Sequence, residues 1–136
     1  MTNQLYIDIE NSTHDMDSLI HHLRPYSING LETHSSAGVE IATLIISVGQ
    51  FIVALIQIPM LIEFFSRQEI IVKLGGIKIN NSVDDLLNII KNNPDLLKEA
   101  KKALQNNALV VEGKGKAVTA FLAKLNDLIN MEKIGR

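Results

Sequence analysis

The feature that most constrains this chain is an apolar stretch in its middle, because residues 41–62 contain no charged side chain. As an α-helix this stretch would be roughly 33 Å long, which is enough to cross the hydrocarbon core of a bilayer. We therefore predict one long apolar helix over residues 39–65. Pro59 has no backbone N–H to donate, so we expect it to kink the last turns of this helix.

Small and polar residues inside the stretch are spaced by three and four positions, which in a helix places them on one narrow stripe. The stripe consists of Glu40, Thr43, Ser47, Gln50, Ala54 and Gln57. Three interpretations use it. The stripe faces water while the rest of the helix is buried in a core, or part of the apolar surface stays open as a partner or oligomer interface. In the third interpretation the helix enters a bilayer, and the stripe faces other helices or an aqueous lumen.

The segments that flank the apolar stretch favour a folded core over a membrane span. Acidic residues precede it, whereas Arg67, Lys73 and Lys78 follow it. By the positive-inside rule, the N-terminal part would then have to cross the membrane as a folded unit. The first ten residues alternate between polar and apolar and lack the pattern of a signal peptide. We expect a cytoplasmic protein, with the inner membrane as the alternative location.

The N-terminal segments predict a strand and a short helix. Residues 5–10 alternate between apolar and polar, as in a strand with one buried face. Ser12 begins a capping-box pattern, and the amphipathic helix after it is expected to end before Pro25. The polar stretch 26–38 is expected to be a loop, with a weak strand near 28–32.

A β-hairpin is predicted over residues 70–80, because Gly75-Gly76 lies between two β-rich runs. A two-residue turn at this point places Lys73 opposite Lys78 on the solvated face. Lysines near a sheet edge prevent unwanted strand pairing, and the same pair can meet an acidic partner or anionic lipid.

The C-terminal part is predicted to be mainly helical. Ser82 caps an amphipathic helix that ends at Asn93-Pro94, where Asn93 caps the next helix and Pro94 begins it. Residues 108–111 are expected to form a strand and 112–116 a turn, and an amphipathic helix follows.

These elements define an α+β fold class. A small sheet, made of the N-terminal strand and the Gly-Gly hairpin, is expected to pack on the long apolar helix 39–65. Residues 1–92 would form this core, and residues 93–136 a helical extension that packs on it or follows it.

The residue types argue against catalysis. The chain has no cysteine, which excludes disulfides, thiolate nucleophiles and zinc knuckles. His14, Asp17 and His21 share one helix face, but a solvated polar face produces this spacing by chance, so we predict no metal site. The Gly-Lys run at 112–116 lacks the spacing of a Walker motif. We predict no enzyme and no cofactor. Tryptophan is absent and other aromatic residues are sparse, so nucleic acid is not the expected partner.

Three runs of residues resemble a known family. They are Val39-Glu-Ile-Ala-Thr-Leu-Ile-Ile-Ser-Val-Gly-Gln50, Glu69-Ile-Ile-Val-Lys-Leu-Gly-Gly-Ile-Lys-Ile79 and Ser82-Val-Asp-Asp-Leu-Leu87. Together with the strand, short helix and polar loop before them, these runs resemble the effector-associated constant component proteins over residues 1–92. That resemblance implies a non-enzymatic accessory or signalling module of prokaryotic conflict and antiviral defence systems, which works beside a separate effector enzyme. It assigns no functional residue.

The sequence therefore predicts an interaction module that associates with itself, as a homo-oligomer, or docks a separate effector protein. The alternative is a membrane-inserting or pore-forming effector that uses the helix 39–65. The candidate interaction residues are Thr43, Ser47, Gln50, Gln57, Phe64, Phe65, Lys73 and Lys78.

Overall fold

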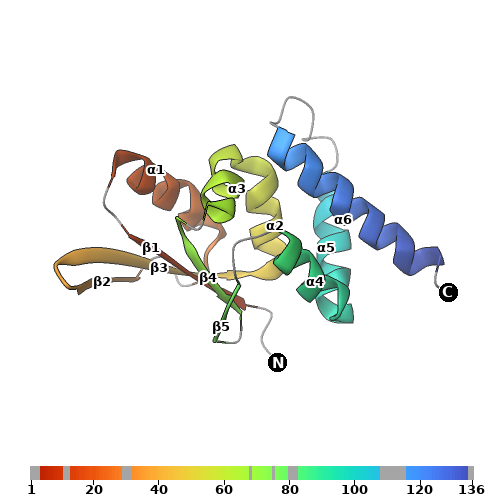
Figure 1. The fold of residues 1–136 in the computed structure, drawn as a ribbon, viewed down its shortest axis with the longest axis horizontal. Helices are drawn as coiled ribbons and strands as arrows, with labels where there is room; N and C mark the ends of the chain where they lie inside the picture. Colours follow the sequence, from red (N-terminus) through yellow and green to blue (C-terminus); the bar gives the residue numbers. More distant parts are fainter. Residues whose placement is uncertain are drawn as a thin grey trace.

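The computed structural model of this 136-residue chain describes residues 4–10, 13–28, 32–67, 69–74, 76–79, 83–107 and 116–134. The described strands are β1 (Gln4–Glu10), β2 (Glu32–Ser36), β3 (Val39–Ser47), β4 (Ile71–Leu74) and β5 (Ile77–Lys78). The described helices are α1 (His14–Leu23), the 3-10 helix η1 (Arg24–Tyr26), α2 (Val48–Gln57), α3 (Pro59–Ser66), α4 (Val83–Lys91), α5 (Pro94–Asn107) and α6 (Lys116–Ile134). The strands form one antiparallel sheet in the order β2-β3-β1-β4-β5, with helices on one of its faces and at one end (Figure 1). The chain is an α+β protein, as predicted.

The central strand of the sheet is β1. Its alternating apolar residues Leu5, Ile7 and Ile9 are fully buried, which confirms the predicted strand with one buried face. Ile7 lies between Leu44 of β3 and Val72 of β4, and both of these side chains are buried as well. Because paired residues in antiparallel strands point to the same face, this register forms one continuous apolar layer under the helices.

The sheet interleaves two β-α-β units. β1 and β2 are joined through α1 and lie on either side of β3, whereas β3 and β4 are joined through α2 and α3 and lie on either side of β1. This order of elements and strands is the split β-α-β arrangement of ferredoxin-like folds. The short β5 extends the sheet by one strand through a hairpin with β4.

The prediction of a single helix over residues 39–65 is wrong. Val39–Ser47 form the strand β3, and the two helices α2 and α3 follow it. The helix begins only at Val48 because the Ser47 side chain accepts a hydrogen bond from the Gln50 amide at 3.2 Å and so caps α2. Pro59 then starts a new helix instead of kinking the first one, since its missing N–H is tolerated at the first helical position.

In the described part of the chain, no single helix is long and apolar enough to cross a membrane. Among the described helices, only α2 and α3 taken together have the length and composition for it, and the pair is bent by 115°. Within the fold, Phe51 of α2 and Phe65 of α3 are buried and meet edge to face, with ring centroids 5.7 Å apart. The bend therefore lets both helices bury apolar side chains in one core.

The start of α1 and the segment between α1 and β3 differ from the prediction. The residue that caps α1 is Thr13, whose hydroxyl accepts from the Met16 amide at 3.2 Å; Ser12 lies outside the described residues. The expected loop 26–38 contains β2, which pairs with β3 as a hairpin. Ala37 and Gly38 turn the chain with positive φ angles of 52° and 79°, as a two-residue hairpin turn requires.

The predicted hairpin at residues 70–80 forms β4 and β5, with Lys73 opposite Lys78. Gly76 has a φ of 81°, whereas Gly75 lies outside the described residues. The register of the hairpin is confirmed.

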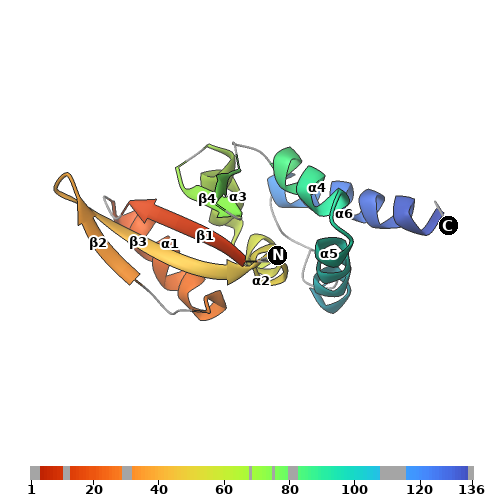
Figure 2. The same cartoon turned by 90° about the horizontal axis from the view of Figure 1, so that it is seen from below.

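Helices α4, α5 and α6 extend the molecule beyond one end of the sheet (Figure 2). Asn93 caps α5, because its side-chain oxygen accepts from the amides of Asp95 and Leu96 at 3.1 and 3.4 Å. α5 packs against α2, and Asp84 of α4 forms an ion pair of 3.0 Å with Lys124 of α6. Ser82, the predicted strand at 108–111 and the predicted turn residues 112–115 lie outside the described residues.

Candidate interaction surface

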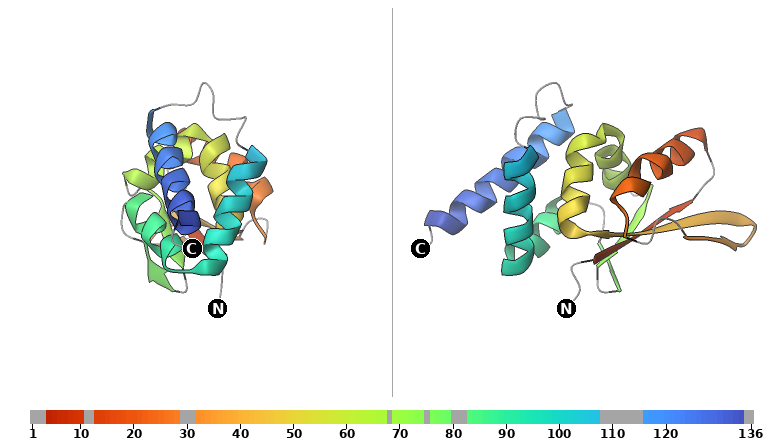
Figure 3. Two further views of the ribbon diagram at one scale, coloured as in Figure 1. Left: turned by 90° about the vertical axis from the view of Figure 1, so that its right-hand side faces the viewer. Right: turned by 180° about the vertical axis from the view of Figure 1, so that it is seen from behind.

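The sheet has one face covered by helices and one open face. α1, α2 and α3 lie on the same side of the sheet, and among the described residues no helix lies on the other side (Figure 3). Side chains that alternate with the buried residues point to the uncovered side. These residues define the open face: Gln4, Tyr6, Asp8, Glu10, Glu32, His34, Ile41, Thr43, Ile45, Ile71, Lys73 and Lys78.

Apolar side chains cross the open face diagonally. Tyr6 lies opposite Ile45 on β3 and opposite Lys73 on β4. Ile71 lies opposite Asp8, and it is therefore a diagonal neighbour of Tyr6. Tyr6 is 44% exposed and Ile71 39%, and the two side chains lie next to each other on this face. We call Ile45, Tyr6 and Ile71 the apolar diagonal.

Carboxylates lie on one side of the apolar diagonal. Asp8 and Glu10 come from β1, and Glu32 comes from the edge strand β2. The Thr43 hydroxyl donates a 2.7 Å hydrogen bond to the Asp8 carboxylate, which fixes the position of that negative charge. This side of the face is therefore acidic.

Lysines lie on the other side of the apolar diagonal. Lys73 and Lys78 are cross-strand neighbours on β4 and β5, so two positive charges sit side by side at this end of the sheet. Like charges in this position repel each other weakly and attract an opposing carboxylate surface. The open face is thus divided into an acidic side, an apolar middle and a basic side.

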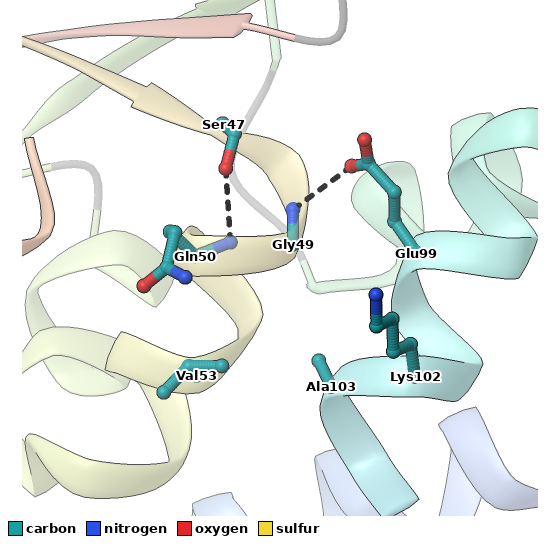
Figure 4. Close-up of a pocket in the computed structure, with 7 residues that line it drawn as sticks. All are labelled: Ser47, Gly49, Gln50, Val53, Glu99, Lys102 and Ala103. Carbon is teal, nitrogen blue, oxygen red and sulfur yellow. Dashed lines mark hydrogen bonds between the residues drawn. The ribbon is translucent and has the colours of Figure 1, made fainter. Parts of the chain in front are cut away.

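A separate groove of about 360 Å³ lies between α2 and α5 (Figure 4). At its rim, the Gly49 amide donates to the Glu99 carboxylate at 3.1 Å, next to the Ser47 cap. A carboxylate is favourable at this point because the N-terminus of a helix carries partial positive charge. Glu99 therefore connects α5 to the N-terminus of α2, and the polar contact at this groove holds two parts of the fold together.

A second groove, of about 390 Å³, lies at the other end of α2 and is lined by His22, Gln57, Ile58 and Met60. The Tyr26 hydroxyl donates a hydrogen bond to the Gln57 side-chain oxygen beside it. Burial raises the pKa of the Tyr26 phenol above its usual value. At neutral pH the phenol thus stays protonated and able to donate this bond.

The predicted stripe is not one surface, because β3 and α2 carry its residues in different directions. Thr43 belongs to the open face, and Gln57 lies at the C-terminal end of α2. Ser47 and Gln50 line the groove between α2 and α5. Their spacing of three and four positions has no common face when half of the residues are in a strand.

The other candidate residues separate into core and surface. Phe65 is 2% exposed and belongs to the core, and Phe64 is partly buried against it. Lys73 and Lys78 lie together on the open face, in the register that the sequence predicts. The structure brings these two lysines and Thr43 to one surface, and it does not bring the phenylalanines there.

The described part of the chain contains no group of three or more His, Cys, Asp or Glu side chains that could hold a metal ion. His21 is 3.8 Å from Asp17 on the exposed face of α1. The open face offers contact area and charge.

Tyr6, Ile45 and Ile71 were not singled out from the sequence. The alternation of residues 5–10 does contain the signal for Tyr6, since it places that side chain opposite to the buried face. No feature of the sequence indicated that Ile45 lies on a sheet face, because residues 39–47 were assigned to a helix.

Comparison of this chain with protein-family models, curated proteins and solved structures finds no match.

Proposed function

We propose that this protein is a non-enzymatic interaction module and that it binds other proteins through the open face of its sheet. The observation that carries this proposal is the apolar diagonal, because three neighbouring apolar side chains remain on an uncovered surface. A contiguous apolar patch with a polar rim is typical of a protein interface, whereas single exposed apolar residues are ordinary.

We further propose that the module works beside a separate effector enzyme in a prokaryotic conflict or antiviral defence system, in the cytoplasm. The support is the resemblance of residues 39–50, 69–79 and 82–87 to the effector-associated constant component proteins. A small, non-enzymatic binding domain is what such an accessory role would require.

A membrane-inserting effector was the alternative, and it depended on a continuous helix over residues 39–65. Those residues form the strand β3 and the helices α2 and α3, which are bent relative to each other by 115°. Both helices direct apolar side chains into the core. No specific observation favours membrane insertion, so we propose the interaction function alone.

The proposal is tested by comparing Ile71→Lys with Ile77→Lys. Both isoleucines lie on the β4–β5 hairpin, but Ile71 points to the open face, whereas the 75% exposed Ile77 points to the opposite side. Wild type and Ile77→Lys are expected to bind equally, either to themselves in light scattering or to proteins captured from a lysate of the source organism. Ile71→Lys is expected to lose that binding.

Circular dichroism and thermal unfolding of both variants provide the control for folding. A wild-type protein that is strictly monomeric and captures nothing would contradict the proposed function. Equal binding by a folded Ile71→Lys variant would show that the interface lies elsewhere.

A further inference from the structure

We propose that the open face binds the same face of a second copy of this chain, with a two-fold axis along the apolar diagonal. This inference rests on the proposed function, because it assigns an occupant to the same surface. The reason is the distribution of charge, which makes the face complementary to itself.

The strand register fixes this distribution. The diagonal runs from Ile45 on β3 through Tyr6 on β1 to Ile71 on β4. The carboxylates all lie on the side of the diagonal toward β2 and the C-terminal end of β1, and they belong to Asp8, Glu10 and Glu32. The two lysines lie on the other side, toward β5.

A two-fold axis that lies along the diagonal, in the plane between two facing sheets, turns one face over onto the other. Residues on the axis then meet their own counterparts, so the apolar diagonals of the two copies pack together. The two sides exchange, and each acidic side comes to lie against a basic side. Lys73 of each copy faces Asp8 of the other, and Lys78 faces Glu10.

Other partners suit this face less well. A purely acidic or purely basic partner would match one side of the diagonal and repel the other, at a cost that like charges at an interface make large. A second copy carries the matching charges in the matching places by symmetry. The open face therefore fits itself better than it fits a partner of uniform charge.

The small size of the face is typical of weak and reversible association. Five strands are roughly 20 Å wide and the nine residues of β3 roughly 30 Å long. Such a face buries on the order of 500 Å² per copy, near the lower limit for specific interfaces. The dimer should thus be reversible, with a dissociation constant in the micromolar range.

The test uses two charge-reversed forms of the full chain, Lys73→Glu with Lys78→Glu and Asp8→Lys with Glu10→Lys, because these four residues make the two ion pairs across the proposed axis. The first has a largely acidic face and the second a largely basic face, so each should associate with itself roughly tenfold more weakly than wild type or worse. An equimolar mixture of the two restores complementarity and should form the dimer again. Sedimentation velocity over a wide range of protein concentration measures all three samples.

The matched control is Lys91→Glu with Lys98→Glu, at exposed positions of α4 and α5. It changes the net charge by the same amount as Lys73→Glu with Lys78→Glu. It should dimerise like wild type. Should a charge-reversed form fail to fold, the wild-type dimer provides an independent test, because its dissociation constant should rise several-fold when salt shortens the Debye length from about 10 Å to about 3 Å.

A monomeric wild type at every concentration would overturn the inference, and so would two folded variants whose mixture stays monomeric. If Ile71→Lys nevertheless abolished binding of a different protein, the proposed function would stand and the second copy would be the wrong occupant. If the wild type bound nothing at all, both proposals would fail.

Discussion

Two glycines near β3 have opposite requirements. Gly38 has a φ of 79° in the turn between β2 and β3, and no heavy atom lies within 4 Å of the position of an added Cβ. Gly49 lies in the first turn of α2, where an added Cβ would touch only the Glu99 side chain, at 3.5 Å or more. At Gly38 the backbone conformation therefore disfavours any other residue, whereas at Gly49 neither the backbone conformation nor the available space excludes a side chain.

We expect Gly38→Ala to lower the free energy of unfolding by about 1 kcal/mol, because an L-residue is strained in the left-handed region. Gly49→Ala should leave it unchanged or raise it by up to about 1 kcal/mol, since alanine favours the helix and restricts the unfolded chain. Urea unfolding followed by circular dichroism measures both. Changes in the same direction and of equal size would contradict this difference.

Tyr26 provides a prediction about pH. Its folded pKa is raised by burial, so the neutral phenol is favoured in the folded state. The associated stability is fully present below the unfolded pKa of about 10 and is lost as pH rises through the folded pKa. Phenolate absorbance of a Tyr6→Phe variant should titrate at higher pH in the folded than in the urea-unfolded protein. Coincident titrations would show that Tyr26 is not shielded.

At the scale of elements, the sequence predicted the helices and strands in which apolar residues recur at a regular spacing. β1, the β4–β5 register and the Asn93-Pro94 helix start all follow from patterns that span only a few residues. The stretch 39–65 lacked such a pattern, because β3 and the two core helices carry apolar side chains on more than one side and no single period separates them.

Two local signals mark the boundaries inside that stretch. Residues 39–47 are rich in β-branched side chains, which favour a strand. Ser47 and Gln50 have the spacing of a capping box, which indicates a helix start. The Ala37-Gly38 turn contains a similar signal for the missed β2–β3 hairpin, although only its glycine is typical of such turns.

The packing of α2 against α3 predicts different roles for two adjacent aromatic residues. Phe65→Ala should lower the free energy of unfolding by about 3 to 5 kcal/mol, because it leaves a cavity beside Phe51. Phe64→Ala should cost clearly less, since Phe64 is only partly buried. Chemical denaturation of the two variants gives the comparison, and a larger loss for Phe64→Ala would place the core differently.

At the scale of the whole molecule, the candidate surface could be predicted only in part. The sequence identified Lys73 and Lys78 as neighbours because one hairpin contains both. The open face, however, joins residues of strands that are far apart in sequence, and its exposure depends on which side the helices cover. Local periodicity does not contain that information, so Tyr6 and Ile71 became visible as a pair only in the fold.

The contact between α5 and α2 predicts that the C-terminal helices are needed for stability. A chain that ends at Asn92 exposes the side of α2 that α5 covers, and it also loses the Glu99 carboxylate at the N-terminus of α2. We expect the shortened chain to bind a hydrophobic dye and to unfold without a sharp transition. A cooperative transition like that of the full chain would show that residues 1–92 fold alone.

The central position of β1 also affects how the molecule is made. Leu5 pairs with Ile46 and Leu74, which the ribosome adds much later than β1 itself. During synthesis, the strand with the most apolar inner side must therefore wait for both of its neighbours. A nascent chain that pauses before β4 is complete would carry β1 with its β4 side unpaired, and that side would stay open to pairing with other strands until the sheet closes.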